Sequence, residues 1–228
     1  MASPFIHRFT EDERARAKTF AEQSKGRGAF YAAKRASRSA KTSTDIENGA
    51  LGEFAARRHL SDMFGERVSV SHVDLEVYDI GRKSWDPDLT ATFKTHADTV
   101  ESVRVHVKTF VCDRYPHIPP SWMFQKGGTG DQCDKDLMRI QPGGNATDWL
   151  VGVLGCVNDP KKRMSNGLVR ETEIADYAVV YGPYQMQTIV DKKLWREPEA
   201  KTLRDMGNRR VLWALDLHEQ VPPIVGFE

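Results

Sequence analysis

The sequence predicts an α/β protein, because one clear helical pattern is followed by several segments with the pattern of strands. Residues 43–60 repeat apolar residues at the spacing of a helix. Three later segments alternate apolar and polar residues, and two further runs are continuously apolar. These strand candidates are residues 68–77, 88–95, 102–111, 149–157 and 177–181. Helices and strands mixed along one stretch of chain are typical of the α/β class.

Residues 1–42 are expected to form a basic N-terminal helical arm. Residues 10–24 have the composition of a polar helix, with Thr10 and Glu13 placed to form a capping box. Residues 25–41 carry six basic residues and no acidic one, with two aromatic residues among them. The basic residues are Lys25, Arg27, Lys34, Arg35, Arg38 and Lys41. Such residues can contact phosphates while neighbouring aromatic rings stack on bases, so we expect nucleic-acid binding here. A solvated basic helix or a disordered arm is the alternative.

Residues 43–228 are expected to form one α/β domain that begins with the helix at 43–60. Its apolar stripe includes Ile46, Ala50 and Phe54. Gly49 and Gly52 each cost about 1 kcal/mol of helix propensity relative to alanine. Glycines at such positions often allow the close approach of a strand or a substrate.

The alternating segments predict strands with one apolar and one polar face. Within 102–111, Val103, Val105 and Val107 occupy one face. The other face carries Arg104, His106 and Lys108, so His106 and Lys108 point the same way.

The remaining segments complete the predicted sheet. Residues 68–77 alternate with a phase shift near His72, and a turn at 96–99 follows residues 88–95. The apolar runs at 149–157 and 177–181 are typical of strands buried on both faces. Residues 112–148 are rich in proline and glycine and are expected to form loops that shape access to a site.

The composition excludes several classes of protein. With 33 basic and 32 acidic residues the net charge is only +1, so any basic surface must be local. The three cysteines contain no CxxC pair, which favours free thiols in a reducing compartment. No apolar run approaches the ~20 residues of a membrane helix, and the N-terminus lacks the apolar core of a signal peptide. We therefore expect a soluble, cytoplasmic protein without a membrane partner.

Asp88 and Lys108 have the pattern of a catalytic pair. Asp88 follows Pro87 at the start of one predicted strand, and Lys108 lies on the next strand. If these strands pair through the turn between them, Asp88 lies beside residues 106 and 108. Mg²⁺ prefers carboxylate, carbonyl and water oxygens, and a neighbouring lysine can orient water and stabilise charge. This arrangement suits metal-assisted hydrolysis of a phosphodiester bond.

The order of these features resembles the PD-(D/E)xK nuclease superfamily, which has the restriction-endonuclease-like fold. The resemblance covers about residues 43–182 and includes the helix motif G-x-x-G-E, the P-D dipeptide and the lysine of the next strand. It implies a central mixed β-sheet flanked by helices. It also implies that Glu53 is the acidic residue of the first helix, that Asp88 binds the metal, and that Lys108 is the catalytic lysine.

His106 departs from the family pattern, because it stands where the family has aspartate or glutamate. Imidazole is a poor ligand for Mg²⁺ and a better one for Mn²⁺, Co²⁺ or Zn²⁺. Three roles are open: a ligand for a softer metal, a general base, or a replacement that leaves the site weakened or inactive.

The sequence therefore predicts an endonuclease that cleaves duplex or branched DNA with a divalent metal, Mg²⁺ or Mn²⁺. Asp88, Glu53 and His106 are the expected metal ligands, and Lys108 is the expected catalytic lysine. A homodimer is the default assembly for duplex cleavage. The alternative is a weakened or inactive protein of the same fold that binds nucleic acid or a protein partner.

Overall fold

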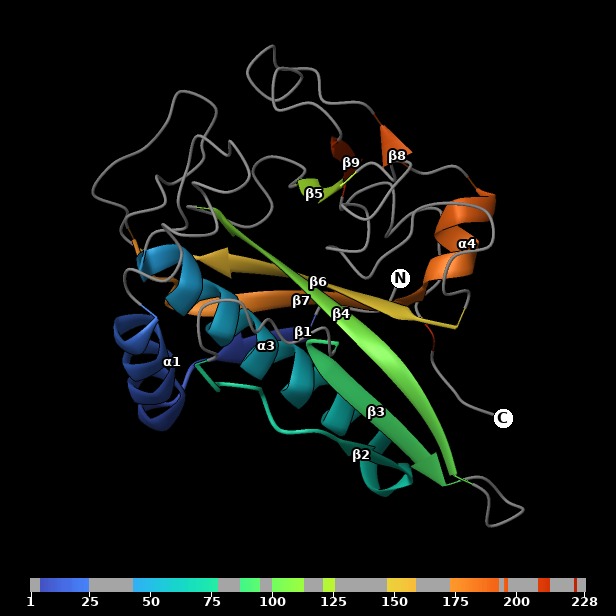
Figure 1. The fold of residues 1–228 in the computed structure, drawn as a ribbon, viewed down its shortest axis with the longest axis horizontal. Coiled ribbons are helices and arrows are strands. Elements are labelled where there is room, and N and C mark those ends of the chain that lie inside the picture. The colour runs from blue at the N-terminus through green and yellow to red at the C-terminus, as the bar shows by residue number, and fades with distance from the viewer. Residues whose placement is uncertain are drawn as a thin grey trace.

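The computed structural model describes residues 5–24, 43–77, 87–94, 100–112, 121–125, 147–158, 173–192, 195–196, 209–213 and 224 (Figure 1). The helices are α1 (Glu11–Gln23), α3 (Ser43–Phe64) and α4 (Met186–Asp191), with a short 3-10 helix η1 (Gly65–Arg67). The first four strands are β1 (Phe5–Arg8), β2 (Val68–Val70), β3 (Leu89–Lys94) and β4 (Val100–Cys112). The others are β5 (Ser121–Gln125), β6 (Trp149–Cys156), β7 (Tyr177–Gln185), β8 (Trp195–Arg196) and β9 (Arg209–Trp213).

A mixed six-stranded sheet flanked by helices is the centre of the fold, in the order β1-β7-β6-β4-β3-β2. Strands β4 and β6 run parallel, whereas the other neighbouring pairs in this sheet run antiparallel. A second sheet has three strands in the order β5-β9-β8. The α/β class and the mixed sheet expected from the sequence are therefore confirmed.

Helix α3 supplies the core on one face of the sheet. Its buried residues include Leu51, Phe54 and Leu60, which belong to the same apolar cluster as Val105 and Val107 of β4. We call this side the helix face. The predicted helix over 43–60 is confirmed and continues to the end of α3, because its apolar side remains in contact with the sheet.

Aromatic rings close the core between α3 and the strands. Phe64 lies 5.2 Å from Phe93 and 5.6 Å from Trp149, measured between ring centroids. The rings of Phe93 and Trp149 are 5.4 Å apart with an interplanar angle of 63°, and those of Phe64 and Phe93 are nearly perpendicular at 86°. Such edge-to-face pairs add about 0.5–1.5 kcal/mol beyond the apolar area that they bury.

The glycine at position 52 brings α3 close to β4. A Cβ atom placed on Gly52 would collide with the side chain of Thr109. At Gly49, by contrast, nothing lies within 4 Å of such an atom. The expected close approach of a strand is therefore confirmed at Gly52.

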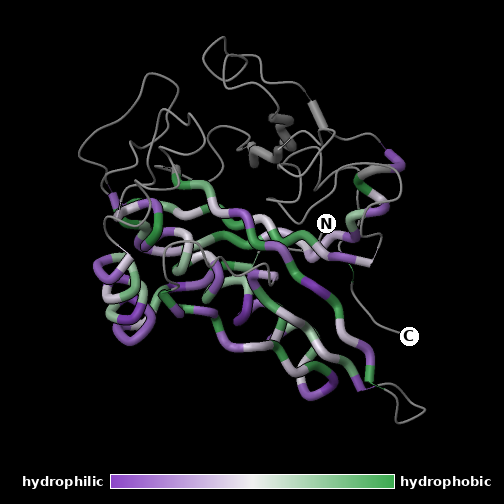
Figure 2. Tube along the Cα trace, in the orientation of Figure 1, coloured by the Kyte–Doolittle hydropathy of each residue, from purple (hydrophilic) through white to green (hydrophobic). Residues whose placement is uncertain are grey.

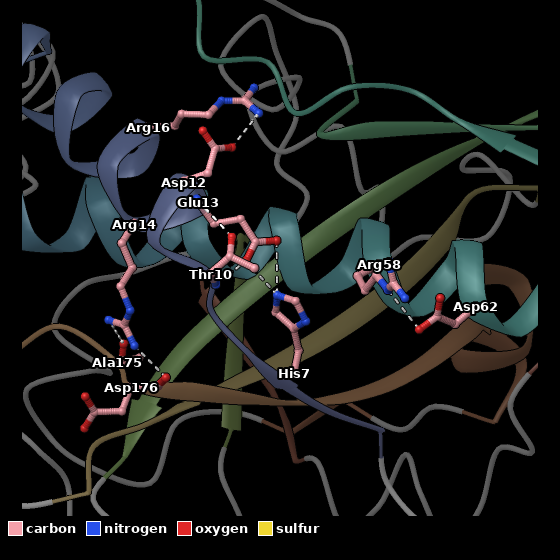
Figure 3. Close-up of polar contacts among 10 residues, drawn as sticks. All are labelled: His7, Thr10, Asp12, Glu13, Arg14, Arg16, Arg58, Asp62, Ala175 and Asp176. Atoms are coloured by element: carbon pink, nitrogen blue, oxygen red, sulfur yellow. Dashed lines mark hydrogen bonds and ion pairs between the residues drawn. The ribbon is translucent and has the colours of Figure 1, made fainter.

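The N-terminal helix begins as its sequence predicts. The Thr10 side chain accepts from the Glu13 amide, and the Glu13 carboxylate accepts from the Thr10 amide, which completes the capping box (Figure 3). Arg14 then donates to the carbonyl oxygens of Ala175 at 3.2 Å and Asp176 at 2.7 Å (Figure 3). Helix α1 also packs against α3, so it is held at the edge of the sheet.

Strand β1 is an element that the sequence analysis did not predict. It pairs antiparallel with β7, with Phe5 opposite Val180 and Arg8 opposite Tyr177. Only four residues long, it is too short to show a period of its own. Residues 5–24 thus join the same sheet and core as α3, while the six basic residues at 25–41 lie outside the described part of the chain.

Strands β6 and β7 have the burial expected of continuous apolar runs. Every residue of β6 is buried, as are seven successive residues of β7. Figure 2 shows hydrophobic colouring along these strands and mainly hydrophilic colouring along α1. The prediction of two strands buried on both faces is confirmed, and β7 runs four residues beyond the predicted end at Tyr181.

The strand predicted over 68–77 is wrong beyond Val70. The Ser71 amide still donates to the Thr90 carbonyl at 2.9 Å, but the Thr90 amide donates to the Ser71 hydroxyl at 3.0 Å, so a side chain replaces the backbone acceptor there. Asp74 then accepts from the Glu76 amide at 2.9 Å, a local bond of the kind that makes turns. The shift in alternation near His72 therefore corresponds to the end of the strand.

Within residues 112–148, expected to be rich in loops, the structure has one strand that the sequence did not predict, β5. This strand pairs antiparallel with β9, whose residues come much later in the chain. Its residues lack an apolar and polar alternation, so local sequence gives no strand signal. Among the described helices, none is long and apolar enough to cross a membrane.

Candidate functional site

Asp88 lies at the start of β3, against the middle of β4. The antiparallel register pairs Leu89 with Val105, so Asp88 comes next to the position of His106. One carboxylate oxygen of Asp88, Oδ2, accepts from the amide of Val107 at 2.7 Å. The two strands therefore pair as expected, and Asp88 contacts the segment that carries His106 and Lys108.

The bond from Val107 to Asp88 also has a structural use. Asp88 directly precedes Leu89, the first residue of β3. At this point the strand no longer supplies a backbone acceptor for the Val107 amide, and the Asp88 side chain supplies one instead. A half-buried carboxylate that accepts a backbone amide stabilises the end of the strand pair. Any test of Asp88 in catalysis must keep this acceptor.

His106 is buried and bonded to an acidic residue that the sequence analysis did not select. Its Nε2 donates to Oδ2 of Asp148 at 2.7 Å, and the two side chains are only 5% and 3% exposed. Asp148 directly precedes β6, and the parallel register places Leu150 opposite His106. The backbone carbonyl of Asp148 also accepts from the Met186 amide, which holds the residue in place.

The bond to Asp148 limits what His106 can do. An imidazole that donates from Nε2 to a carboxylate has its tautomer and ring orientation set by that bond. Only Nδ1 then remains for a proton or a metal. The sequence placed His106 on the polar face of its strand, and the structure places it on that face but buried against Asp148.

Lys108 follows His106 on the same side of β4. It is half-buried, and its parallel neighbour on β6 is Gly152, which has no side chain to crowd it. The side chains of Val107 and Thr109 point the opposite way, toward α3. The predicted alternation of faces along β4 is confirmed at these positions.

Glu53 approaches β4 from the helix face. It follows Gly52, the point where α3 touches Thr109, and its side chain is half-buried. His106 and Lys108 belong to the other face of the sheet. The structure thus brings Asp88 next to the His106–Lys108 segment and places Glu53 on the helix at the same level of β4.

Metal ligands were expected at Asp88, Glu53 and His106. Among the residues that the structure describes, no group of three or more His, Cys, Asp or Glu side chains is arranged to hold a metal ion. Mg²⁺ usually keeps several waters and takes only one or two carboxylates from a protein. The carboxylate chemistry of Asp88 fits that mode of binding.

No protein-family model, curated protein or solved structure matches this chain. The geometry around β3 and β4 is therefore the basis for a functional proposal.

Proposed function

We propose that this chain is a metal-dependent endonuclease with a restriction-endonuclease-like fold, which hydrolyses phosphodiester bonds in DNA at Asp88. The observation that carries the proposal is the contact between Asp88 and Val107, at 2.7 Å from Oδ2 to the amide nitrogen. It puts the carboxylate beside the strand segment that holds Lys108. The mixed sheet, with α3 against one face, agrees with the resemblance seen in the sequence.

The residues around Asp88 have complementary chemical tasks in this proposal. Asp88 would hold the divalent cation, whereas Glu53 lies on the helix face of β4 and is left out of the proposed ligand set. The bound cation supplies charge neutralisation at the phosphate and lowers the pKa of a water molecule. Lys108 positions that water or stabilises the negative charge that develops on the phosphate oxygens.

His106 acts through its pairing with Asp148 in this proposal. A carboxylate that fixes Nε2 leaves Nδ1 as a base or as a ligand for a softer metal than Mg²⁺. Mn²⁺ would therefore support cleavage at least as well as Mg²⁺ if Nδ1 is a ligand.

A second candidate function is favoured by the burial of His106. His106 is 4% exposed and paired with Asp148, so its role can be structural, within the core, rather than catalytic. In that case the protein binds nucleic acid without cleaving it. The two functions differ in whether a metal-dependent break appears in the DNA.

The deciding experiment compares cleavage by wild type, Asp88→Asn and Lys108→Gln. Plasmid, branched DNA and RNA are incubated with Mg²⁺ or Mn²⁺. Asparagine keeps an oxygen that accepts from Val107 but lacks the charge that binds a metal, so the Asp88→Asn protein stays folded. We expect both variants to lose cleavage by about a hundredfold or more.

Asp62→Asn is the matched control, because Asp62 pairs with Arg58 on the exposed side of α3 (Figure 3). It removes one carboxylate charge far from Asp88 and should cleave like wild type. Cleavage that persists in both site variants would refute the assignment of Asp88 and Lys108. Binding by the wild type without cleavage under either metal would favour the second function.

A further inference from the structure

Among the described elements, only helix α3 covers the outer half of the sheet, and it lies on one face. Helix α3 packs on the helix face of β2, β3 and β4, behind β3 and β4 in the view of Figure 1. The opposite side of these strands, which we call the open face, alternates with the buried valines and carries polar residues. They are Ser69, Thr90, Thr92, Lys94, Ser102 and Arg104.

The open face consists of hydroxyl groups and cations. Ser69, Lys94 and Ser102 are exposed, and Thr90 and Thr92 are half-buried. The hydroxyls of Thr92 and Ser102 lie 3.2 Å apart across the two strands. The strand residues of this face include no acidic side chain until Asp88 is reached at the end of β3.

Arg104 adds a half-buried cation to this face. Its Nε atom is buried and has no hydrogen-bond partner in the described part of the chain. Register places Arg104 opposite Thr90, between the exposed end of the face and His106. A buried guanidinium nitrogen without an acceptor costs free energy, and the half-buried Arg104 places a positive charge beside the exposed residues of this face.

The open face is long enough to bind a segment of the DNA sugar-phosphate backbone, and it leads toward Asp88. Lys94 and Asp88 stand at opposite ends of β3, and six steps along a strand span about 20 Å. That length matches about six base pairs, because successive phosphates along one DNA strand rise about 3.4 Å. A backbone lying on Lys94, Arg104 and the hydroxyls would lead to Asp88.

We propose that the open face binds the phosphodiester backbone of duplex DNA and directs it toward Asp88. Hydroxyl, lysine and arginine side chains are the usual partners of phosphate oxygens, and they fix register without reading bases. A protein partner would require an apolar centre. Among its described residues, the open face has a single exposed large apolar side chain, Val100 at its outer end, which is 64% exposed. This inference rests on the proposed function, and it names the surface that the substrate uses.

The test measures binding rather than cleavage. A fluorescent duplex is titrated by anisotropy in the presence of a chelator, with the full chain as wild type and as the double variant Lys94→Gln/Arg104→Gln. We expect affinity to fall about tenfold or more, because two phosphate contacts are lost. The slope of log affinity against log salt should become shallower by about 2.

The control double variant Lys18→Gln/Arg58→Gln removes the same charge from exposed positions on α1 and α3. It should bind like wild type, which separates a local contact from the effect of net charge. Thr92→Val adds a variant that retains β propensity and removes one hydroxyl, and it should weaken binding without changing the salt slope. A duplex with methylphosphonate linkages, which lack the charge, should bind weakly to wild type.

The inference is overturned if the Lys94/Arg104 variant binds as wild type does, if both double variants lose affinity equally, or if wild type prefers RNA or single strands. Wild-type cleavage is scored separately with metal present. Cleavage that persists while the open-face variant binds normally refutes this surface and leaves the proposed function standing. Wild-type binding at the open face without cleavage would support this surface and refute the proposed endonuclease activity.

Discussion

At the scale of single residues, His106 shows how a tertiary partner redefines a side chain. Alternation along the strand correctly places His106 beside Lys108 on one face. Its buried hydrogen-bond partner, however, is Asp148, which directly precedes β6 and reaches His106 diagonally across the parallel pair of β4 and β6. An acidic residue before an apolar run is a visible signal, but the sequence does not contain its register against β4.

Replacing Asp148 with alanine should destabilise the fold. The change leaves the Nε2–H group of His106 buried without an acceptor, which costs about 1–3 kcal/mol in the free energy of unfolding. Chemical denaturation followed by circular dichroism measures this loss. Asp62→Ala is the control, because its exposed pair with Arg58 should contribute less than about 1 kcal/mol. Equal effects of the two changes would mean that the buried bond is not formed in solution.

At the scale of elements, the contact between α3 and β4 determines how the helix lies on the sheet. Glycine at position 52 lets the helix backbone meet Thr109, and Glu53 is carried to the same level of β4. The sequence predicted a close approach from the glycines of this helix. It could not say which of the two glycines makes the contact, because both lie on similar sides of the helix.

Alanine at position 52 should destabilise the protein, whereas alanine at position 49 should not. The new methyl group at 52 overlaps Thr109 and should cost about 1–3 kcal/mol in the free energy of unfolding. At 49 there is open space, so the better helix propensity of alanine should stabilise by up to about 1 kcal/mol.

Thr109→Ala provides the second half of this test. In the double variant Gly52→Ala/Thr109→Ala the overlapping atoms are gone, so the combined cost should be smaller than the sum of the single costs. The free energy of unfolding is measured by urea denaturation for wild type, the two single variants and the double variant. Strict additivity would show that Gly52 and Thr109 are not in contact.

At the scale of the whole molecule, the N-terminal segment and α3 both depend on strand β7. Strand β1 pairs with β7, and Nε2 of His59 on α3 donates to the carbonyl of Gly182 at 2.8 Å. The ring of Phe5 lies 4.9 Å from that of His59. Helix α3, the edge strand β1 and its neighbour β7 thus meet at the buried His59.

The stability of the whole fold should depend on pH through His59. Burial lowers the pKa of His59 below its ordinary value of 6.5, and the bond to Gly182 offsets part of that effect. The unfolded chain then binds a proton near pH 6.5 that the folded protein does not accept. The contribution of neutral His59 to the free energy of unfolding should therefore be complete above pH 6.5 and should decrease as the pH drops below 6.5.

The variant His59→Gln isolates this dependence. Glutamine can donate to the Gly182 carbonyl but does not titrate, so its stability should fall less between pH 7 and pH 5 than that of wild type. Burial also raises the pKa of Glu47, which gives a pH dependence of its own, but that contribution is common to both proteins and cancels in the difference. Parallel curves for the two proteins would contradict a neutral, buried His59.

The sequence by itself determined the class of the fold and most of its regular elements. The period of apolar residues predicts α3, β3 and β4, and continuous apolar runs predict β6 and β7, because the burial of each segment is visible in its local sequence. It also determined that Asp88 and Lys108 belong to neighbouring strands, since a short turn makes such strands pair. These parts of the candidate site depend on contacts close along the chain.

The tertiary structure alone decided the partners that lie far apart in sequence. The bond of His106 to Asp148, the pairing of β1 with β7, the strand at β5 and the open side of β2–β4 all depend on strand order and register. Strand order and register follow from the packing of the whole core, because a local period does not specify which segment becomes the neighbour.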